Sequence, residues 1–122
     1  MSTVTLTPPN AILFVFDPSN QNVTVPDYVN AQLIAANATC ISVGTQAPVD
    51  GDTVVSLCEP ETYRKGLEKV FDGRIETPSR RVAVVTSEFQ QVLEMSVSST
   101  ITDVAVWADD LRSPGRLVVE VS

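Results

Sequence analysis

Short runs of alternating apolar and polar residues, rich in Val, Ile and Thr, recur along this 122-residue chain and constrain its fold more than any other feature. Such runs are typical of β-strands that bury one face, because successive side chains of a strand point to opposite sides. Turn-forming residues separate the runs at a spacing of roughly ten positions, which is typical of an antiparallel sandwich. The predicted strands cover residues 11–16, 39–44, 53–58, 80–86, 91–97, 102–107 and 116–121.

Two segments fit the strand pattern less well. Residues 27–37 combine good helix formers with Asp27 as an N-cap, which favours a two-turn α-helix or a 3₁₀ segment. Residues 60–73 carry hydrophobic side chains at helical spacing, which favours a short helix or an ordered loop. The sequence therefore predicts a mainly β fold, an antiparallel β-sandwich of about seven to eight strands with one or two short helices, as a single domain over residues 1–122.

Both cysteines lie in a predicted β-hairpin whose loop contains Pro48 and Asp50-Gly51. In one register Cys40 faces Cys58, and a cross-strand disulfide is geometrically feasible. A shift of one residue places them on opposite faces. A structural zinc site takes four nitrogen or sulfur ligands, and the chain contains no histidine. We expect two free buried thiols, with a disulfide as the alternative, and no bound metal.

The absence of histidine also limits catalysis. It removes the commonest general base and excludes Ser–His and Cys–His nucleophile pairs. No phosphate-binding loop or dinucleotide fingerprint is present. A carboxylate pair for glycoside chemistry could come from Asp50 and Asp52 or from Asp109 and Asp110, but these acids read as turn residues. We therefore expect a protein that is not an enzyme and needs no cofactor.

Calcium is a further alternative, because loops at one end of a β-sandwich can gather carboxylates and calcium takes six to eight oxygen ligands. None of the loops matches an EF-hand. A calcium- or carbohydrate-binding module is thus one function class that the sequence leaves open. The candidate ligands are Asp17, Asn20, Asn22, Asp50, Asp52, Asp109 and Asp110.

Charge is distributed unevenly along the chain, whose net charge is −7. No basic residue precedes Arg64, and residues 82–111 contain five acids and no base. An acidic surface repels nucleic acid and attracts basic proteins, so we expect a basic protein partner and no direct binding of nucleic acid. The candidate partner-binding residues are the loop acids and the single tryptophan: Asp50, Asp52, Trp107, Asp109 and Asp110.

No apolar run is long enough to span a bilayer, and the N-terminus lacks the basic region of a signal peptide. We expect a soluble cytoplasmic protein without membrane contact.

The C-terminal strand offers a different function. Residues 116–121 follow a tight Ser-Pro-Gly turn and run to the chain end, which suggests an uncovered edge. Pairing of this edge with a second copy would give a homo-oligomer, as in a structural or assembly subunit of the viral or phage type.

Three stretches resemble the competence protein J family. They are "VPDYVNAQLIAANATCISVGT" at 25–45, "ETPSRRVAVVTSEF" at 76–89 and "LRSPGRLVVEV" at 111–121. The family has an aromatic residue after the glycine of the last motif, where this chain has Arg116. The resemblance implies a small β-rich intracellular protein without catalysis, and the founding member inhibits a DNA-entry nuclease. The leading interpretation is therefore an acidic protein-binding module that inhibits a nuclease.

Overall fold

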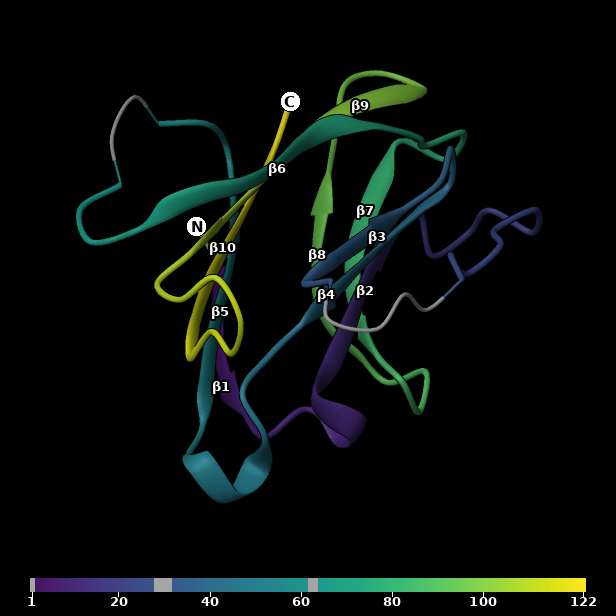
Figure 1. Cartoon of the computed structure of the whole chain (residues 1–122). Helices are drawn as coiled ribbons and strands as arrows, with labels where there is room; N and C mark the ends of the chain where they lie inside the picture. The colour runs from purple at the N-terminus through teal and green to yellow at the C-terminus, as the bar shows by residue number, and fades with distance from the viewer. Residues whose placement is uncertain (1, 28–31, 62–63) are drawn as a thin grey trace.

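The computed structural model describes residues 2–27, 32–61 and 64–122, which form two five-stranded sheets packed face to face (Figure 1). We call the sheets A and B. Sheet A has the order β1 (Ser2–Leu6), β5 (Thr53–Cys58), β10 (Arg116–Val121), β9 (Ile101–Ala108) and β6 (Glu68–Glu76). Sheet B has the order β3 (Ile34–Ala36), β4 (Cys40–Gly44), β2 (Ile12–Phe16), β7 (Arg81–Thr86) and β8 (Gln91–Ser96).

The predicted fold class is confirmed, with ten strands among the described residues rather than seven or eight. Two single-turn 3₁₀ segments, Pro9–Ala11 and Pro48–Asp50, are the helical elements of these residues. One pairing departs from the antiparallel prediction, because β5 and β10 run parallel.

The core lies between the sheets and follows the alternation of the strands. On β10, Leu117, Val119 and Val121 point into the core, whereas Val118 and Glu120 lie on the outer face of sheet A. Sheet B contributes matching residues such as Leu13 and Val84. Because hydrophobic burial is roughly proportional to the apolar area removed from water, this two-sided core supplies the main driving force for the fold.

The predicted hairpin between residues 39–44 and 53–58 is wrong. The first run forms β4 in sheet B and the second forms β5 in sheet A, so the intervening loop crosses from one sheet to the other. Cys40 therefore pairs with Phe16, and Cys58 pairs with Glu120. Both thiols are free and buried, as the preferred interpretation of the sequence expected.

The first predicted helix, over residues 27–37, is wrong where the structure describes it, because its described residues contain a short strand and no helix. Residues 28–31 lie outside the described residues, and Ile34–Ala36 form β3, paired with β4. The Asn37 side chain builds the turn between these strands, since its Oδ1 accepts hydrogen bonds from the amides of Thr39 and Cys40, each at 2.9 Å. Pairing with β4 thus overrides a weak helix propensity.

The second predicted helix is also wrong from residue 68 onward, where β6 pairs with β9. A β-bulge between Lys69 and Phe71 explains the misleading spacing. An extra residue in the strand lets Val70 and Phe71, neighbours in sequence, both pack against the core. This arrangement imitates the spacing of a helical face.

The C-terminal strand is not an edge. β10 lies in the middle of sheet A, between β5 and β9, so the predicted homo-oligomer contact through it is wrong. The edges of sheet A are β1 and β6. β6 carries charged residues and a bulge, features that discourage edge-to-edge pairing.

Within the described part of the chain, no helix is long and apolar enough to cross a membrane.

Candidate protein-binding site

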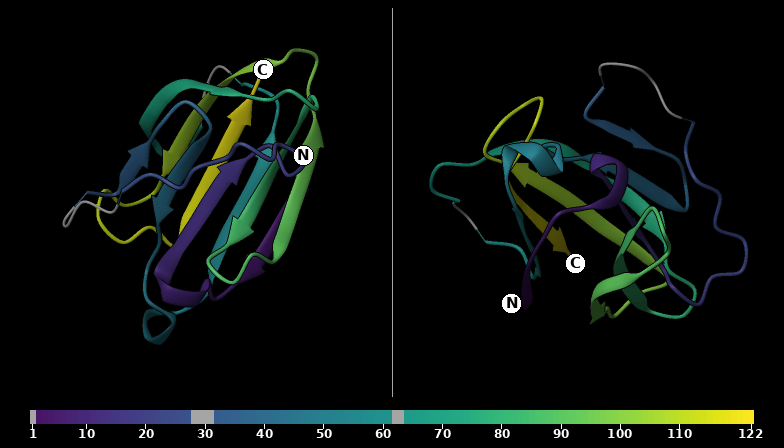
Figure 2. Two further views of the ribbon diagram at one scale, coloured as in Figure 1. Left: turned by 90° about the vertical axis from the view of Figure 1, so that its right-hand side faces the viewer. Right: turned by 90° about the horizontal axis from the view of Figure 1, so that it is seen from below.

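Four loops meet at one end of the sandwich. The β4–β5 loop is joined to the β9–β10 loop by a hydrogen bond from the Gln46 amide to the Pro114 carbonyl, at 2.9 Å. It is joined to the β1–β2 loop by the Thr45 amide and the Ala11 carbonyl, also at 2.9 Å. The β1–β2 loop in turn contacts the β7–β8 loop. The view from below in Figure 2 shows the four loops in a row.

This row of loops carries a strong excess of negative charge, and we call it the acidic end. It consists of residues 7–11, 45–52, 87–90 and 109–115. These segments contain five acids and a single base, Arg112. Four of the predicted partner-binding residues belong to it, so the structure brings together two acidic pairs that lie far apart in the sequence.

The acids of the β9–β10 loop organise their own backbone. Asp109 Oδ1 accepts hydrogen bonds from the amides of Gly115 and Arg116 at 3.0 and 3.1 Å. Asp110 Oδ1 accepts the amides of Arg112 and Ser113, both at 2.8 Å. The hydrogen bonds from these amides lower the pKa of Asp110, which keeps it ionised. Both residues are exposed, and the loop therefore presents its charges in a fixed arrangement.

Gln46 connects the loop of Asp50 and Asp52 to the loop of Asp109 and Asp110. Its Nε2 donates to the Asp52 carbonyl at 2.7 Å. The same amide group lies so close to Gly115 that a Cβ added there would be 2.9 Å from Nε2. Gln46 could not be identified from the sequence, because a glutamine in a polar loop gives no signal of a contact about seventy positions away.

Apolar side chains accompany the charges on these loops. Val49 is 93% exposed and lies next to Asp50, and Leu111 is 60% exposed and follows Asp110. Large exposed apolar residues within a polar surround are typical of protein-protein interfaces. The acidic end thus combines exposed negative charge with exposed apolar side chains.

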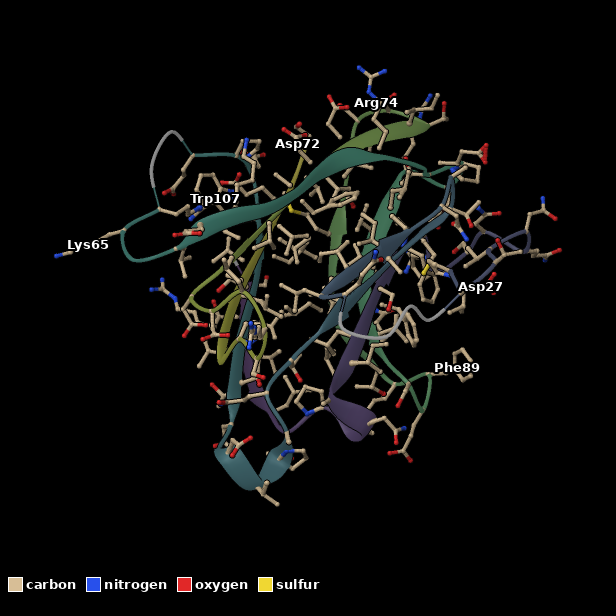
Figure 3. All side chains as sticks on the ribbon, viewed as in Figure 1. Asp27, Lys65, Asp72, Arg74, Phe89 and Trp107 are labelled. Atoms are coloured by element: carbon tan, nitrogen blue, oxygen red, sulfur yellow. The ribbon has the colours of Figure 1, made fainter. Side chains whose placement is uncertain are left out.

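Trp107, the fifth predicted partner-binding residue, lies apart from these loops on the outer face of sheet A (Figure 3). It is partly buried and packs on Cys58, Leu67 and Val118. Its indole Nε1 donates to Glu120 Oε1 at 2.8 Å, and Lys69 Nζ is 5.5 Å from the ring centroid.

A buried ion pair that was not predicted from the sequence lies next to Trp107. Arg64 and Glu120 are 7% and 4% exposed, and Arg64 Nη2 is 2.8 Å from Glu120 Oε2. The same guanidinium nitrogen donates to the Cys58 thiol at 3.0 Å. Burial works to raise the pKa of Glu120, but hydrogen bonds from the Glu61 amide, Trp107 and Arg64 outweigh it and hold the pKa below its usual value. The signal in the sequence was a lone glutamate among the apolar residues 117–121 of β10.

The proposed calcium ligands do not come together. Asp17 follows β2, at the opposite end of that strand from the acidic end, and is fully buried. Its carboxylate accepts the Ser79 amide and hydroxyl and the Ser19 amide. Burial would raise the pKa of Asp17, but these hydrogen bonds and the charge of Arg81 lower it. No group of three or more metal-ligating side chains occurs among residues 2–27, 32–61 and 64–122.

The thiols are poor nucleophiles in this setting. Burial raises the pKa of Cys40 to about 12. Burial also raises the pKa of Cys58, against the opposing charge of Arg64. Because the thiolate is the reactive form, neither cysteine is primed for chemistry at neutral pH.

The site and the fold together describe a two-layer β-sandwich with a rigid acidic end. The same fold occurs in the crystal structure of ComJ from Bacillus subtilis, an inhibitor of the DNA-degrading activity of NucA. The two chains are 12% identical, with a TM-score of 0.72 over 99% of this chain and 94% of ComJ. The resemblance to the competence protein J family is thereby confirmed as a likeness of fold. No protein-family model matches the sequence, and no curated protein matches it.

Proposed function

We propose that this protein is a non-catalytic inhibitor of a DNA-degrading nuclease, and that the acidic end binds the basic surface with which the nuclease holds DNA. The observation that carries the proposal is the joining of two acidic loops into one surface on a fold shared with ComJ. A nuclease must attract phosphates, so its DNA-binding groove is basic. Carboxylates held in a fixed array can occupy that groove in place of phosphates.

The partner-binding residues of this proposal are Asp50, Asp52, Asp109 and Asp110, with Val49 and Leu111 as apolar contacts. Asp109 and Asp110 use one oxygen for the loop, and among the described residues no hydrogen bond reaches Oδ2 of either carboxylate. Those oxygens are available to arginine and lysine side chains. Charge on this surface would also accelerate association with a basic partner.

Trp107 would lie at the margin of the proposed interface. Part of its ring is accessible, and it precedes the acidic β9–β10 loop by two residues. As the only tryptophan of the chain, it also reports on binding nearby. We expect its fluorescence to change when the nuclease binds. An inhibitor of this kind would act in the cytoplasm.

Inhibition of DNA degradation by purified NucA tests the proposal. Wild-type protein should slow the reaction in proportion to its concentration. The Asp109→Asn/Asp110→Asn variant keeps the acceptors of the loop hydrogen bonds and removes two charges, and it should need at least about tenfold more protein for the same inhibition. The Asp50→Asn/Asp52→Asn variant should behave likewise.

The matched control is Glu59→Gln/Glu76→Gln, which removes two exposed charges outside the acidic end. Equal loss of inhibition in the control would show that net charge alone matters, and would exclude a defined acidic surface. Absence of inhibition by the wild-type protein would exclude the proposed function as an inhibitor of a NucA-type nuclease.

A further inference from the structure

The β7–β8 turn holds a phenylalanine in a backbone conformation that suits glycine. The Phe89 amide donates to the Thr86 carbonyl and the Thr86 amide donates to the Gln90 carbonyl, both at 2.9 Å. Between these bonds Phe89 adopts a φ of 62°. Three-residue hairpin loops place a residue in this left-handed region, and glycine is the usual choice because a side chain there meets the backbone.

Phe89 gains nothing from the described fold in return for this strain. Its side chain is 74% exposed and points away from the sandwich (Figure 3). An aromatic ring normally contributes to stability by burial, which is absent here. Other residues of this chain share the positive φ, but at Phe89 the strain coincides with a large exposed aromatic ring, a combination that favours a role outside the fold.

The turn is held rigidly by its neighbours. Thr86 Oγ1 accepts hydrogen bonds from the amides of Glu88 and Gln90 at 3.3 and 3.2 Å. Ser87 Oγ accepts from Asn10 Nδ2 at 2.9 Å and donates to the Pro9 carbonyl at 3.1 Å. A ring presented by a fixed turn loses little conformational freedom on binding, and this raises affinity.

The position of the turn indicates the chemistry of its partner. The β7–β8 loop is the last in the row of the acidic end, where Ser87 is bonded to Asn10 of the β1–β2 loop, and the exposed Glu88 precedes Phe89 in the sequence. The three loops 7–11, 45–52 and 87–90 contain no lysine or arginine. An apolar pocket bordered by basic side chains would therefore accept the ring and complement its surroundings.

We propose that Phe89 is an anchor residue of the inhibitory interface, which inserts into an apolar pocket on the basic face of the nuclease. This inference rests on the proposed function and adds a specific contact to it. A single aromatic anchor in a pocket often carries a large part of the binding energy.

The chain supplies a matched control at the other end of the same strand. Arg80 precedes β7, is exposed and has a φ of 60°. Its amide donates to the Thr77 carbonyl at 2.9 Å, so it closes a turn as Phe89 does. Glycine at either position relieves the same kind of strain, but only one position lies at the acidic end.

The experiment compares Phe89→Gly, Arg80→Gly and wild-type protein in thermal unfolding and in inhibition of NucA. Both variants should raise the Tm, by roughly 2–4 °C. Phe89→Gly should need at least about tenfold more protein for half-inhibition, whereas Arg80→Gly should inhibit as the wild type does.

The outcomes separate the two proposals. Inhibition by Phe89→Gly equal to that of the wild type overturns the anchor and leaves the proposed function intact. A lower Tm for Phe89→Gly also overturns the anchor, because the ring would then serve the fold. If wild-type protein does not inhibit NucA, the proposed function and the anchor fall together.

Discussion

Charged residues concentrate in two regions of this molecule, the outer face of sheet A and the acidic end, and the two regions treat charge in opposite ways. On the outer face, Arg64 and Glu120 are buried and bonded to each other, and Trp107 completes the set. At the acidic end, Asp50 and Asp110 are exposed, and their region contains almost no positive charge.

This difference in burial means that the charges of the outer face serve stability, whereas those of the acidic end are free to serve recognition. A buried charge is tolerable only with its partners in place, so removing one member of the outer-face pair should destabilise the fold. An exposed carboxylate keeps its hydration and costs the fold little, so it is available to a second molecule. Mutations on the outer face should therefore change the free energy of unfolding, and mutations at the acidic end should change inhibition of the nuclease.

The largest effect should come from Arg64→Met. This variant leaves Glu120 buried without its partner and should lower the free energy of unfolding by about 3–5 kcal/mol. Urea denaturation followed by Trp107 fluorescence measures it. The double variant Arg64→Met/Glu120→Leu should recover most of the loss, because no unpaired charge is left. A loss below about 1 kcal/mol in the single variant would contradict a structural role for the pair.

A smaller effect should appear when the pH falls. The pKa values of Asp17 and Glu120 lie below their usual values in the folded protein. The unfolded chain therefore binds these protons first, and stability decreases as the pH falls from about 5 through the folded pKa values. Urea midpoints between pH 3 and pH 8 measure this profile. Asp17→Asn should make it shallower, and an unchanged slope would show that this carboxyl does not contribute.

Added salt should slow binding through the acidic end and leave the stability that depends on the outer face unchanged. Raising NaCl from 0.05 to 0.5 M should slow association with NucA by roughly tenfold, because exposed charges are screened. Stopped-flow measurement of Trp107 fluorescence gives the rate. The urea midpoint should change little over the same range. An association rate independent of salt would mean that the partner recognises shape and not charge.

The smallest effect should come from Gln46→Ala, which removes the side-chain link between the acidic loops. We expect a loss of stability of less than about 1 kcal/mol, since the bond at Asp52 is neutral and exposed. Inhibition should weaken by about two- to fivefold, because the loops keep only their backbone bonds. Half-inhibition and urea midpoints measured on the same samples would detect either change, and a large loss of stability would contradict this view.

The strands were predictable where alternation and β-branched residues coincide, as in Arg81–Thr86 and Arg116–Val121. β1 was missed because Ser2–Leu6 lies at the chain end beside two prolines, where the same alternation reads as a tail. β6 was missed because its bulge disturbs the period of two. Local pattern thus identifies regular strands and fails where the strand itself is irregular.

The candidate site was predictable in composition and not in arrangement. The loop acids Asp50, Asp52, Asp109 and Asp110 stood out in the sequence because turn residues and charge coincide there. Gln46 and Phe89 did not, since the first contacts Gly115 in a distant loop and the second is notable through its backbone angle. Trp107 was recognised as notable, but its bond to Glu120 depends on the pairing of β9 with β10.

The sequence by itself determined that this chain forms a β-sandwich with acidic loops, because side-chain alternation and turn chemistry are local properties. Only the tertiary structure decided which strand joins which sheet, since alternation gives the buried face of a strand and not its neighbour. That choice separated Cys40 from Cys58, placed β10 inside sheet A and brought the acidic loops together. The physical reason is that pairing and burial of charge depend on contacts between residues far apart in the chain, whose energies no local pattern contains.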